Sequence, residues 1–175
     1  MADLEGRLRA LVRDIPDYPK PGILFKDITP LLGDGAAFRE ACDAMAHPYL
    51  ESGISHVIAI ESRGFLFGGA IATRLAAGLV PVRKVGKLPF KTERVEYALE
   101  YGTDSLEMHV DALPAGSRAL IVDDVLATGG TAAATIRLVN KVGASVGGCS
   151  FLIRLSFLPG LLGLGGVPST SLITY

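Results

Sequence analysis

Residues 119–131 decide the fold, and they are Ala119-Leu120-Ile121-Val122-Asp123-Asp124-Val125-Leu126-Ala127-Thr128-Gly129-Gly130-Thr131. The apolar run Ala119 to Asp123 predicts a buried strand, and the pattern that follows predicts a helix from about Thr131 to Val142. In open parallel sheets, ligands bind beyond the carboxyl ends of the strands. The polar turn that follows this strand is therefore the first candidate for a binding site.

The chemistry of this turn favours a phosphate. Gly129 and Gly130 allow backbone conformations that bring amide N–H groups close to an anion, and the next helix adds free N–H groups at its N-terminus. The hydroxyls of Thr128 and Thr131 are further donors. Carboxylates repel phosphate, so the Asp123-Asp124 pair suits sugar hydroxyls or a hydrated metal ion instead.

Two alternatives concern the same residues. Taken singly, an Asp-Asp or a Gly-Gly pair is most often an ordinary turn or helix cap, but their order between an apolar strand and a helix favours a site. The phosphate loop of nucleotide triphosphatases requires Gly-x4-Gly-Lys-Ser/Thr, which this sequence lacks, and no Gly-x-Gly-x-x-Gly fingerprint follows a strand.

The rest of the chain repeats the pattern of apolar strand, turn and helix. Short runs that are apolar on both faces and alternate with helices are typical of a mostly parallel sheet flanked by helices, so we expect an α/β fold. The other expected strands are 56–60, 79–83 and 145–153, and the other expected helices are 4–15, 36–51 and 65–77.

Two segments do not follow that pattern. Pro16 to Gly22 contains three prolines, which predicts an extended loop leading to residues 23–27. Lys84 to Asp111 is rich in charge and holds two alternating stretches, 94–98 and 105–109. We expect a β-ribbon or flexible lid loop there, because long ordered insertions between core strands are often lids.

Composition limits the class of protein. A chain of 175 residues fits one domain, 1–175, and its net charge of −1 gives no global attraction to nucleic acid or to anionic lipid. Cys42 and Cys149 lie in apolar surroundings and are expected to be buried, reduced thiols. No signal peptide or membrane-spanning run is visible, so we expect a cytoplasmic protein with neither nucleic-acid nor membrane partners.

The motif at 120–131 resembles the signature for phosphoribosyl pyrophosphate (PRPP) in the type I phosphoribosyltransferases. Other segments are similar to the members of that family that act on adenine, and the similarity runs from about Ile15 to Leu155. These segments are 17–28, 61–68, 83–89 and 97–102.

The resemblance implies a reaction and a set of roles. Adenine would react with PRPP to give AMP and pyrophosphate, with Mg2+ required and carried mainly by PRPP, so that no direct protein ligand for the metal is predicted. The two aspartates, Asp123 and Asp124, would face the ribose hydroxyls. The 5′-phosphate would be held by Ala127, Thr128, Gly129, Gly130 and Thr131. The pyrophosphate would be bound by Arg63, Arg83, Lys84 and Lys87.

The adenine site and the proton transfer are also implied by the resemblance. Ile23, Phe25 and Lys26 would form the base pocket, within a small N-terminal hood of residues 1–34. Glu100 would transfer a proton at adenine N7, because a carboxyl in a closed site can have its pKa raised. Tyr101 would pack on the sugar or the base when the lid, about residues 84–111, closes over the reacting centre.

Other functions on the same fold remain alternatives. A PRPP-sensing regulator generally needs a DNA-binding appendage, for which the chain has no helix-turn-helix extension. A structural nucleotide-binding subunit would bind ligand without turnover. The resemblance also implies a homodimer. It weakens at Leu158 to Gly166, which we expect to affect the surface, oligomer contacts or stability rather than the chemistry.

Overall fold

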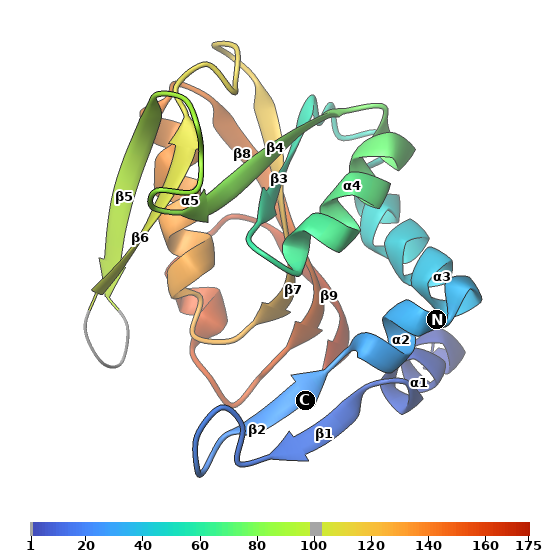
Figure 1. The fold of residues 1–175 in the computed structure, drawn as a ribbon. Helices are drawn as coiled ribbons and strands as arrows, with labels where there is room; N and C mark the ends of the chain where they lie inside the picture. Colours follow the sequence, from blue (N-terminus) through green and yellow to red (C-terminus); the bar gives the residue numbers. More distant parts are fainter. Residues whose placement is uncertain (1, 99–102) are drawn as a thin grey trace.

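The computed structural model describes residues 2–98 and 103–175 as an α/β fold built on one large sheet (Figure 1). In the described part of the chain, this sheet has seven strands in the order β5-β6-β4-β3-β7-β8-β9. The strands β3, β4, β7, β8 and β9 run parallel, while β6 pairs antiparallel with both β4 and β5. The expected α/β class with a mostly parallel sheet is therefore confirmed.

The strands of the large sheet are β3 (His56–Ile60), β4 (Gly78–Lys84), β5 (Thr92–Ala98), β6 (Thr103–His109), β7 (Arg118–Leu126), β8 (Ser145–Arg154) and β9 (Ser169–Thr174). A separate antiparallel pair consists of β1 (Arg13–Pro16) and β2 (Leu24–Asp27). The helices are α1 (Ala2–Ala10), α2 (Thr29–Gly33), α3 (Gly35–Ala46), α4 (Gly64–Leu75) and α5 (Gly130–Lys141). Two short 3-10 turns complete the chain, η1 (His47–Tyr49) and η2 (Gly160–Leu164).

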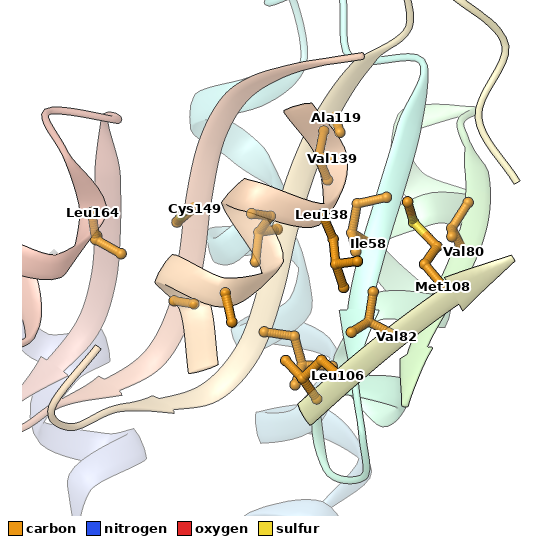
Figure 2. Close-up of a cluster of buried hydrophobic side chains, with 14 of the residues drawn as sticks. Ile58, Val80, Val82, Leu106, Met108, Ala119, Leu138, Val139, Cys149 and Leu164 are labelled. Carbon is orange, nitrogen blue, oxygen red and sulfur yellow. The ribbon is translucent and has the colours of Figure 1, made fainter. Parts of the chain in front are cut away.

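Alternate residues of the central strands face two separate hydrophobic cores. Ile58 and Ile121 pack under α5 and the β5-β6 hairpin, in the cluster that Figure 2 shows. Val57 and Leu120, their neighbours in sequence, pack under the helices α1 to α4 on the opposite face. All four residues are fully buried. Because both faces are covered, these strands are apolar throughout, as buried parallel strands usually are.

Close packing of α4 on the sheet depends on glycine. A Cβ at Gly68 would lie 2.5 Å from the Cβ of Ala59 in β3, and one at Gly64 would lie 2.8 Å from the carbonyl oxygen of Val122. The absence of side chains at these two positions lets α4 begin directly over β3 and β7. The N-terminus of α4 is thereby fixed at the carboxyl edge of the sheet, where the expected site lies.

Several boundaries differ from the sequence-based expectation. The first helix ends at Ala10, not before Pro16, because residues 13–16 pair with β2, and Ile15 lies opposite Phe25. The helix expected over 36–51 ends at Ala46 and continues as η1. The strand expected to end at Asp123 continues to Leu126, since β7 stays paired with β8 up to Arg154.

Candidate active site

The carboxyl ends of β3, β4 and β7 meet beneath the hood to form a cleft of about 530 Å³. Segments from seven parts of the chain line it: β2 with the residue before it, the β3-α4 turn, the end of β4, the β5-β6 hairpin, the end of β7, the start of α5 and the residue after β8. Of the residues predicted from the sequence, those that line this cleft are Ile23, Phe25, Lys26, Arg63, Lys84, Asp123, Asp124, Ala127 and Thr131.

A smaller cup opens beside this cleft at the start of α5. It is lined by residues 125–132 together with Asp123 and Phe151, and its volume is about 70 Å³. Gly129 precedes α5 with φ at 81°, in the left-handed region that favours glycine. No side chain caps this helix, so its first amide groups remain available to an anion, as helix N-termini commonly are. Thr128, Gly129 and Gly130 lie in this cup.

The two adjacent aspartates lie within the last residues of β7. The Asp124 side chain is 6% exposed, and its Oδ2 atom lies 2.8 Å from Nε of Arg63. Oδ1 of Asp123 accepts a hydrogen bond from the backbone N–H of Asp124 at 2.9 Å. Burial, followed by the neighbouring charge of Asp124, raises the pKa of Asp123 well above its ordinary value. Burial also raises the pKa of Asp124, against the opposing effect of Arg63.

The four predicted cations divide into two pairs. Arg63 and Lys84 line the cleft, whereas Arg83 and Lys87 do not. Glu61 holds the second pair: its carboxylate lies 3.4 Å from Nε of Arg83 and 2.7 Å from Nζ of Lys87. Glu61 itself lines the cleft at the end of β3.

Sequence reasoning missed the role of Glu61. Burial opposes its ionisation, but hydrogen bonds from Lys87, the Lys84 backbone and Arg83 outweigh burial, so its pKa is lowered. An acidic residue directly after a buried strand was the available signal, since Glu61 follows Ile60 as Asp123 follows Val122.

The segment predicted to bind the base, residues 23–26, lies on β2 and just before it. The Phe25 ring packs edge-on against Tyr18 with 5.1 Å between ring centroids, and the Arg63 guanidinium lies 4.9 Å from the Phe25 centroid. The ammonium group of Lys26 already has partners within the protein, because it lies 2.6 Å from Asp14 and 3.7 Å from the centre of the Tyr175 ring. The charge of Lys26 is therefore already paired within the protein.

The β5-β6 hairpin contributes three further residues that the sequence analysis did not single out. Tyr97, Asp104 and Leu106 line the cleft. Asp104 lies 3.0 Å from Nζ of Lys84, which raises the pKa of that lysine, and the Tyr97 hydroxyl lies 3.4 Å from Asp104. The hairpin is thus tied to the end of β4 across the cleft.

A buried carboxylate at Glu107 fixes the loop between β4 and β5. Oε1 of Glu107 accepts hydrogen bonds from three consecutive backbone N–H groups, and Oε2 accepts one from the Thr92 hydroxyl at 3.1 Å. The Arg94 guanidinium lies 3.3 Å from Oε2. The three backbone donors are Gly86, Lys87 and Leu88. Glu107 is 1% exposed, so this side chain is an internal clasp for the loop that carries Lys87.

Glu100 and Tyr101, the predicted proton-transfer and lid residues, lie outside the described residues. The ends of the hairpin that bracket them, Ala98 and Thr103, are opposite each other in the β5-β6 register. Their roles remain predictions.

The Leu/Gly-rich segment 158–166 corrects one expectation. Although it is distant in sequence from the predicted site, η2 packs directly against the turn that is predicted to bind the 5′-phosphate. A Cβ added at Gly129 would overlap the carbonyl group of Gly160, and one added at Gly160 would overlap the carbonyl oxygen of Ala127. Residues 158–166 are therefore far from the predicted site in sequence but lie next to it in the folded chain.

The comparison with known families first identifies the class. The family model described as "Phosphoribosyl transferase domain" matches residues 32–155, the part that holds the cation-bearing turn, the hairpin and the phosphate-binding turn. The fold and the cleft are those of a phosphoribosyltransferase.

Individual relatives narrow the class. The adenine phosphoribosyltransferase of Nitrobacter hamburgensis is 56% identical over 156 residues, which cover 89% of this chain and 87% of the relative. The crystal structure of adenine phosphoribosyltransferase from Rhodothermus marinus matches with a TM-score of 0.96 and 51% identity over 100% of both chains. The Saccharomyces cerevisiae enzyme, complexed with D-2,5-dideoxy-2,5-imino-altritol 1,6-bisphosphate and adenine, matches with a TM-score of 0.92 and 39% identity over 98% and 99% of the two chains. The chain belongs to the adenine phosphoribosyltransferase family.

Proposed function

We propose that this cleft transfers the 5-phosphoribosyl group of PRPP to adenine, giving AMP and pyrophosphate, a reaction of purine salvage. The observation that carries the proposal is a cleft with an adjoining cup, lined together by an aspartate pair, the glycine turn at the start of α5, two cations and the aromatic Phe25. Each group matches one part of the two substrates.

The phosphate-binding turn, Ala127 to Thr131, is proposed to hold the 5′-phosphate. Left-handed Gly129 and the uncapped start of α5 support this role, because they offer backbone N–H groups without a competing side-chain acceptor. Asp123 and Asp124 would then face the ribose. Charge develops on the ribose as the bond to pyrophosphate breaks, and carboxylates close to an oxocarbenium-like sugar would stabilise it.

Arg63 and Lys84 are proposed to bind the leaving pyrophosphate, since both line the cleft and carry positive charge. Arg83 and Lys87 would act from the same side, released in part from Glu61 when a more highly charged anion arrives. Mg2+ would enter bound to PRPP and would neutralise pyrophosphate charge. Asp123 and Asp124 fit such a cation, because two desolvated carboxyl groups with raised pKa values are stabilised by added positive charge.

The base is proposed to lie between the hood and the sheet. Ile23 and Phe25 would contact the ring faces, and backbone groups near Lys26 would pair with its edge. Adenine presents an amino donor at the position where hypoxanthine presents an acceptor. A site that pairs with one leaves a buried group unpaired with the other, which can discriminate by roughly 10⁴–10⁵-fold.

Residues 1–34 and about 84–111 would act as base-binding hood and lid within a single functional unit, 1–175. Glu100 would move the proton at adenine N7, and Tyr101 would help to exclude water as the lid closes.

A cytoplasmic location is also proposed. Its support is the pair of free, buried thiols at Cys42 and Cys149, since reducing compartments preserve such thiols. Among residues 2–98 and 103–175, no helix has the length and apolarity needed to cross a bilayer.

A homodimer is proposed on the face formed by α4 and β4. Large apolar side chains are exposed there: Leu66 at 48%, Leu79 at 49% and, in the following loop, Phe90 at 55%. Within the described residues, β6 pairs with β4 only at Arg83 and Lys84, so the preceding part of β4 presents an open edge. Contiguous apolar surface beside an open strand edge is typical of an interface.

The deciding experiment is a base panel. Purified protein is incubated with PRPP, Mg2+ and, in turn, adenine, guanine, hypoxanthine or orotate, and the nucleotide product is separated and quantified. We expect AMP from adenine and little product from the other bases. Product from another base alone would overturn the assignment of adenine, and no product from any base would overturn the transferase function.

A further inference from the structure

The η2 turn and the phosphate-binding turn meet backbone to backbone. The Gly129 and Gly160 positions each lack room for a Cβ, because the carbonyl group of Gly160 fills one space and that of Ala127 fills the other. A Cβ at Gly160 would also lie 3.0 Å from Cγ of Leu126. Two main chains are therefore in direct contact at the turn that holds the first amide groups of α5.

The η2 turn is itself anchored to the sheet. Leu164 is 2% exposed and belongs to the core beneath α5, where Figure 2 shows it near Cys149. Leu161 and Leu162 point outward instead, at 46% and 85% exposed. The turn thus has a fixed apolar attachment on one side and the phosphate-binding turn on the other. Figure 1 shows this red helical turn beside α5.

We propose that η2 is a rigid support for the phosphate-binding turn and that Gly160 is a positioning residue for the 5′-phosphate, an inference that rests on the proposed function. Amide donors stabilise an anion fully only when they are held in place before it arrives. Gly129 is in a left-handed conformation, with φ at 81°. Contact with the Gly160 backbone limits how far Gly129 can move outward.

The proposal predicts a selective kinetic defect in Gly160→Ala. The added methyl group must push the Ala127 carbonyl or Leu126 aside, which displaces the donors of the 5′-phosphate. Losing one hydrogen bond to a charged phosphate weakens binding by roughly 10- to 100-fold, so we expect KM for PRPP to rise by about that factor. KM for adenine should change much less, because the base loop lies on β2. Steady-state kinetics with each substrate varied in turn give both constants.

Gly163→Ala is the matched control. It adds the same methyl group to the same turn, but its Cβ would lie 3.4 Å from the nearest atom, the carbonyl oxygen of Gly129, which is ordinary contact. We expect its KM for PRPP to stay close to that of the wild type. A folded Gly160→Ala protein with an unchanged KM for PRPP would overturn the proposal, and so would equal defects in the two variants.

Leu164→Val decides the question if Gly160→Ala does not fold. This substitution shortens the apolar anchor of η2 without touching the phosphate-binding turn, and it leaves a small void in the core beneath α5. We expect a lower Tm together with a raised KM for PRPP. A lower Tm with unchanged KM for PRPP would overturn the support role.

A binding measurement separates this proposal from the proposed function. The shift in Tm produced by ribose 5-phosphate depends on the phosphate-binding turn and requires no turnover. We expect a smaller shift in Gly160→Ala than in the wild type and in Gly163→Ala. If the wild type made no nucleotide from any base, the transferase function would fail, while this loss of stabilisation would still support η2 as a positioning element. Equal shifts in all three proteins would overturn it.

Discussion

Asp123 and Asp124 place two carboxyl groups side by side in a site where Arg63 supplies the neighbouring positive charge. Burial disfavours the charged form of each, and their mutual repulsion adds to that effect at Asp123. In the absence of substrate, such a pair lowers the stability of the folded protein. In the proposed reaction, the same two charges would stabilise the positive charge that develops on the ribose. Stabilising substitutions are often found at functional positions of this type.

Asp123→Asn is expected to stabilise the ligand-free protein at pH 7 by about 1 kcal/mol while it lowers turnover. The substitution removes one of two adjacent charges, yet the amide oxygen of asparagine can still accept the hydrogen bond from the Asp124 N–H. Urea denaturation measures the free energy of unfolding. Asp111→Asn, at an exposed position, is the control and should change neither stability nor turnover.

The stabilisation should depend on pH in a defined direction. The pKa of Asp123 is raised in the folded protein, so the folded state holds this proton more tightly than the unfolded state does. The destabilising effect of its charge is therefore absent below the unfolded pKa of about 4 and grows as pH rises toward the folded value. The advantage of Asp123→Asn should shrink as pH falls toward 4. An equal advantage at pH 4 and pH 7 would contradict this account.

Glu100→Gln is expected to lower kcat by roughly 10²–10⁴-fold, the range typical for the loss of a general acid or base. KM for PRPP should change little, because the proposed contact is with the base. Glu96→Gln, which alters an exposed residue of β5, is the control. A Glu100→Gln enzyme as active as the control would remove the proposed proton-transfer role.

At the scale of elements, the loop between β4 and β5 is ordered from within by Glu107. Burial opposes ionisation of this carboxyl, but hydrogen bonds from Leu88, Thr92, Gly86 and Lys87 outweigh it and lower its pKa. The loop starts just after the cleft-lining Lys84 and contains Lys87. A single side chain of β6 therefore holds the backbone of Lys87, one of the proposed pyrophosphate-binding residues.

Glu107→Gln should destabilise the protein by roughly 1–3 kcal/mol at pH 7, because the amide replaces only one of the two acceptor oxygens and removes the charge that faces Arg94. Since the folded pKa is lowered, the contribution of the carboxylate is present above about pH 4 and is lost as pH falls through the folded value. Urea denaturation at pH 7 and at low pH measures the difference. We expect KM for PRPP to rise as the loop loosens, whereas Glu93→Gln, on the neighbouring strand, should leave that constant unchanged.

At the scale of the whole molecule, the sheet and the site differ in how far sequence alone predicts them. Strands such as His56–Ile60 are predictable because apolar runs buried on both faces leave a continuous signal. The confirmed family assignment likewise depends on local motifs, at 120–131 and in four other short segments. The contact of Gly160 with Gly129 has no local signal, since it joins segments that are brought together only by the completed sheet. The spacing of apolar residues also predicted a helix as far as Ile15, but residues 13–16 instead form a strand because they pair with β2.

The strand β9 was missed for a related reason. Its first residues, Ser169, Thr170 and Ser171, are polar and give a weak strand signal, although they pair in parallel with β8. Pairing with a buried neighbour supplied the stabilisation that their own side chains do not indicate. The role of Glu107 was hidden in the same way, because its backbone donors lie about twenty residues earlier.

Leu79→Glu is expected to shift the protein from dimer to monomer, because it places a charge on the apolar face of α4 and β4. Sedimentation velocity over a wide range of protein concentrations measures the change. Leu162→Glu is the matched control, since Leu162 is 85% exposed on the separate surface of η2. If Leu162→Glu produced monomers and Leu79→Glu did not, the interface would lie on the C-terminal segment instead.

The attachment of the hood to β9 has a consequence for how the protein is made. Arg9 donates a hydrogen bond to the Thr174 carbonyl, Glu5 accepts one from the Thr174 N–H, and the ring of Tyr175 covers the Lys26 ammonium. The first two contacts join residues 165 and 169 positions apart. At ribosomal rates of 5–20 residues per second, α1 and β2 are made on the order of ten seconds before these partners. Late in that interval, once residue 154 has been made, a nascent chain has its turn at 127–131 but an unsupported hood and an open edge on β8, so chaperones would bind there.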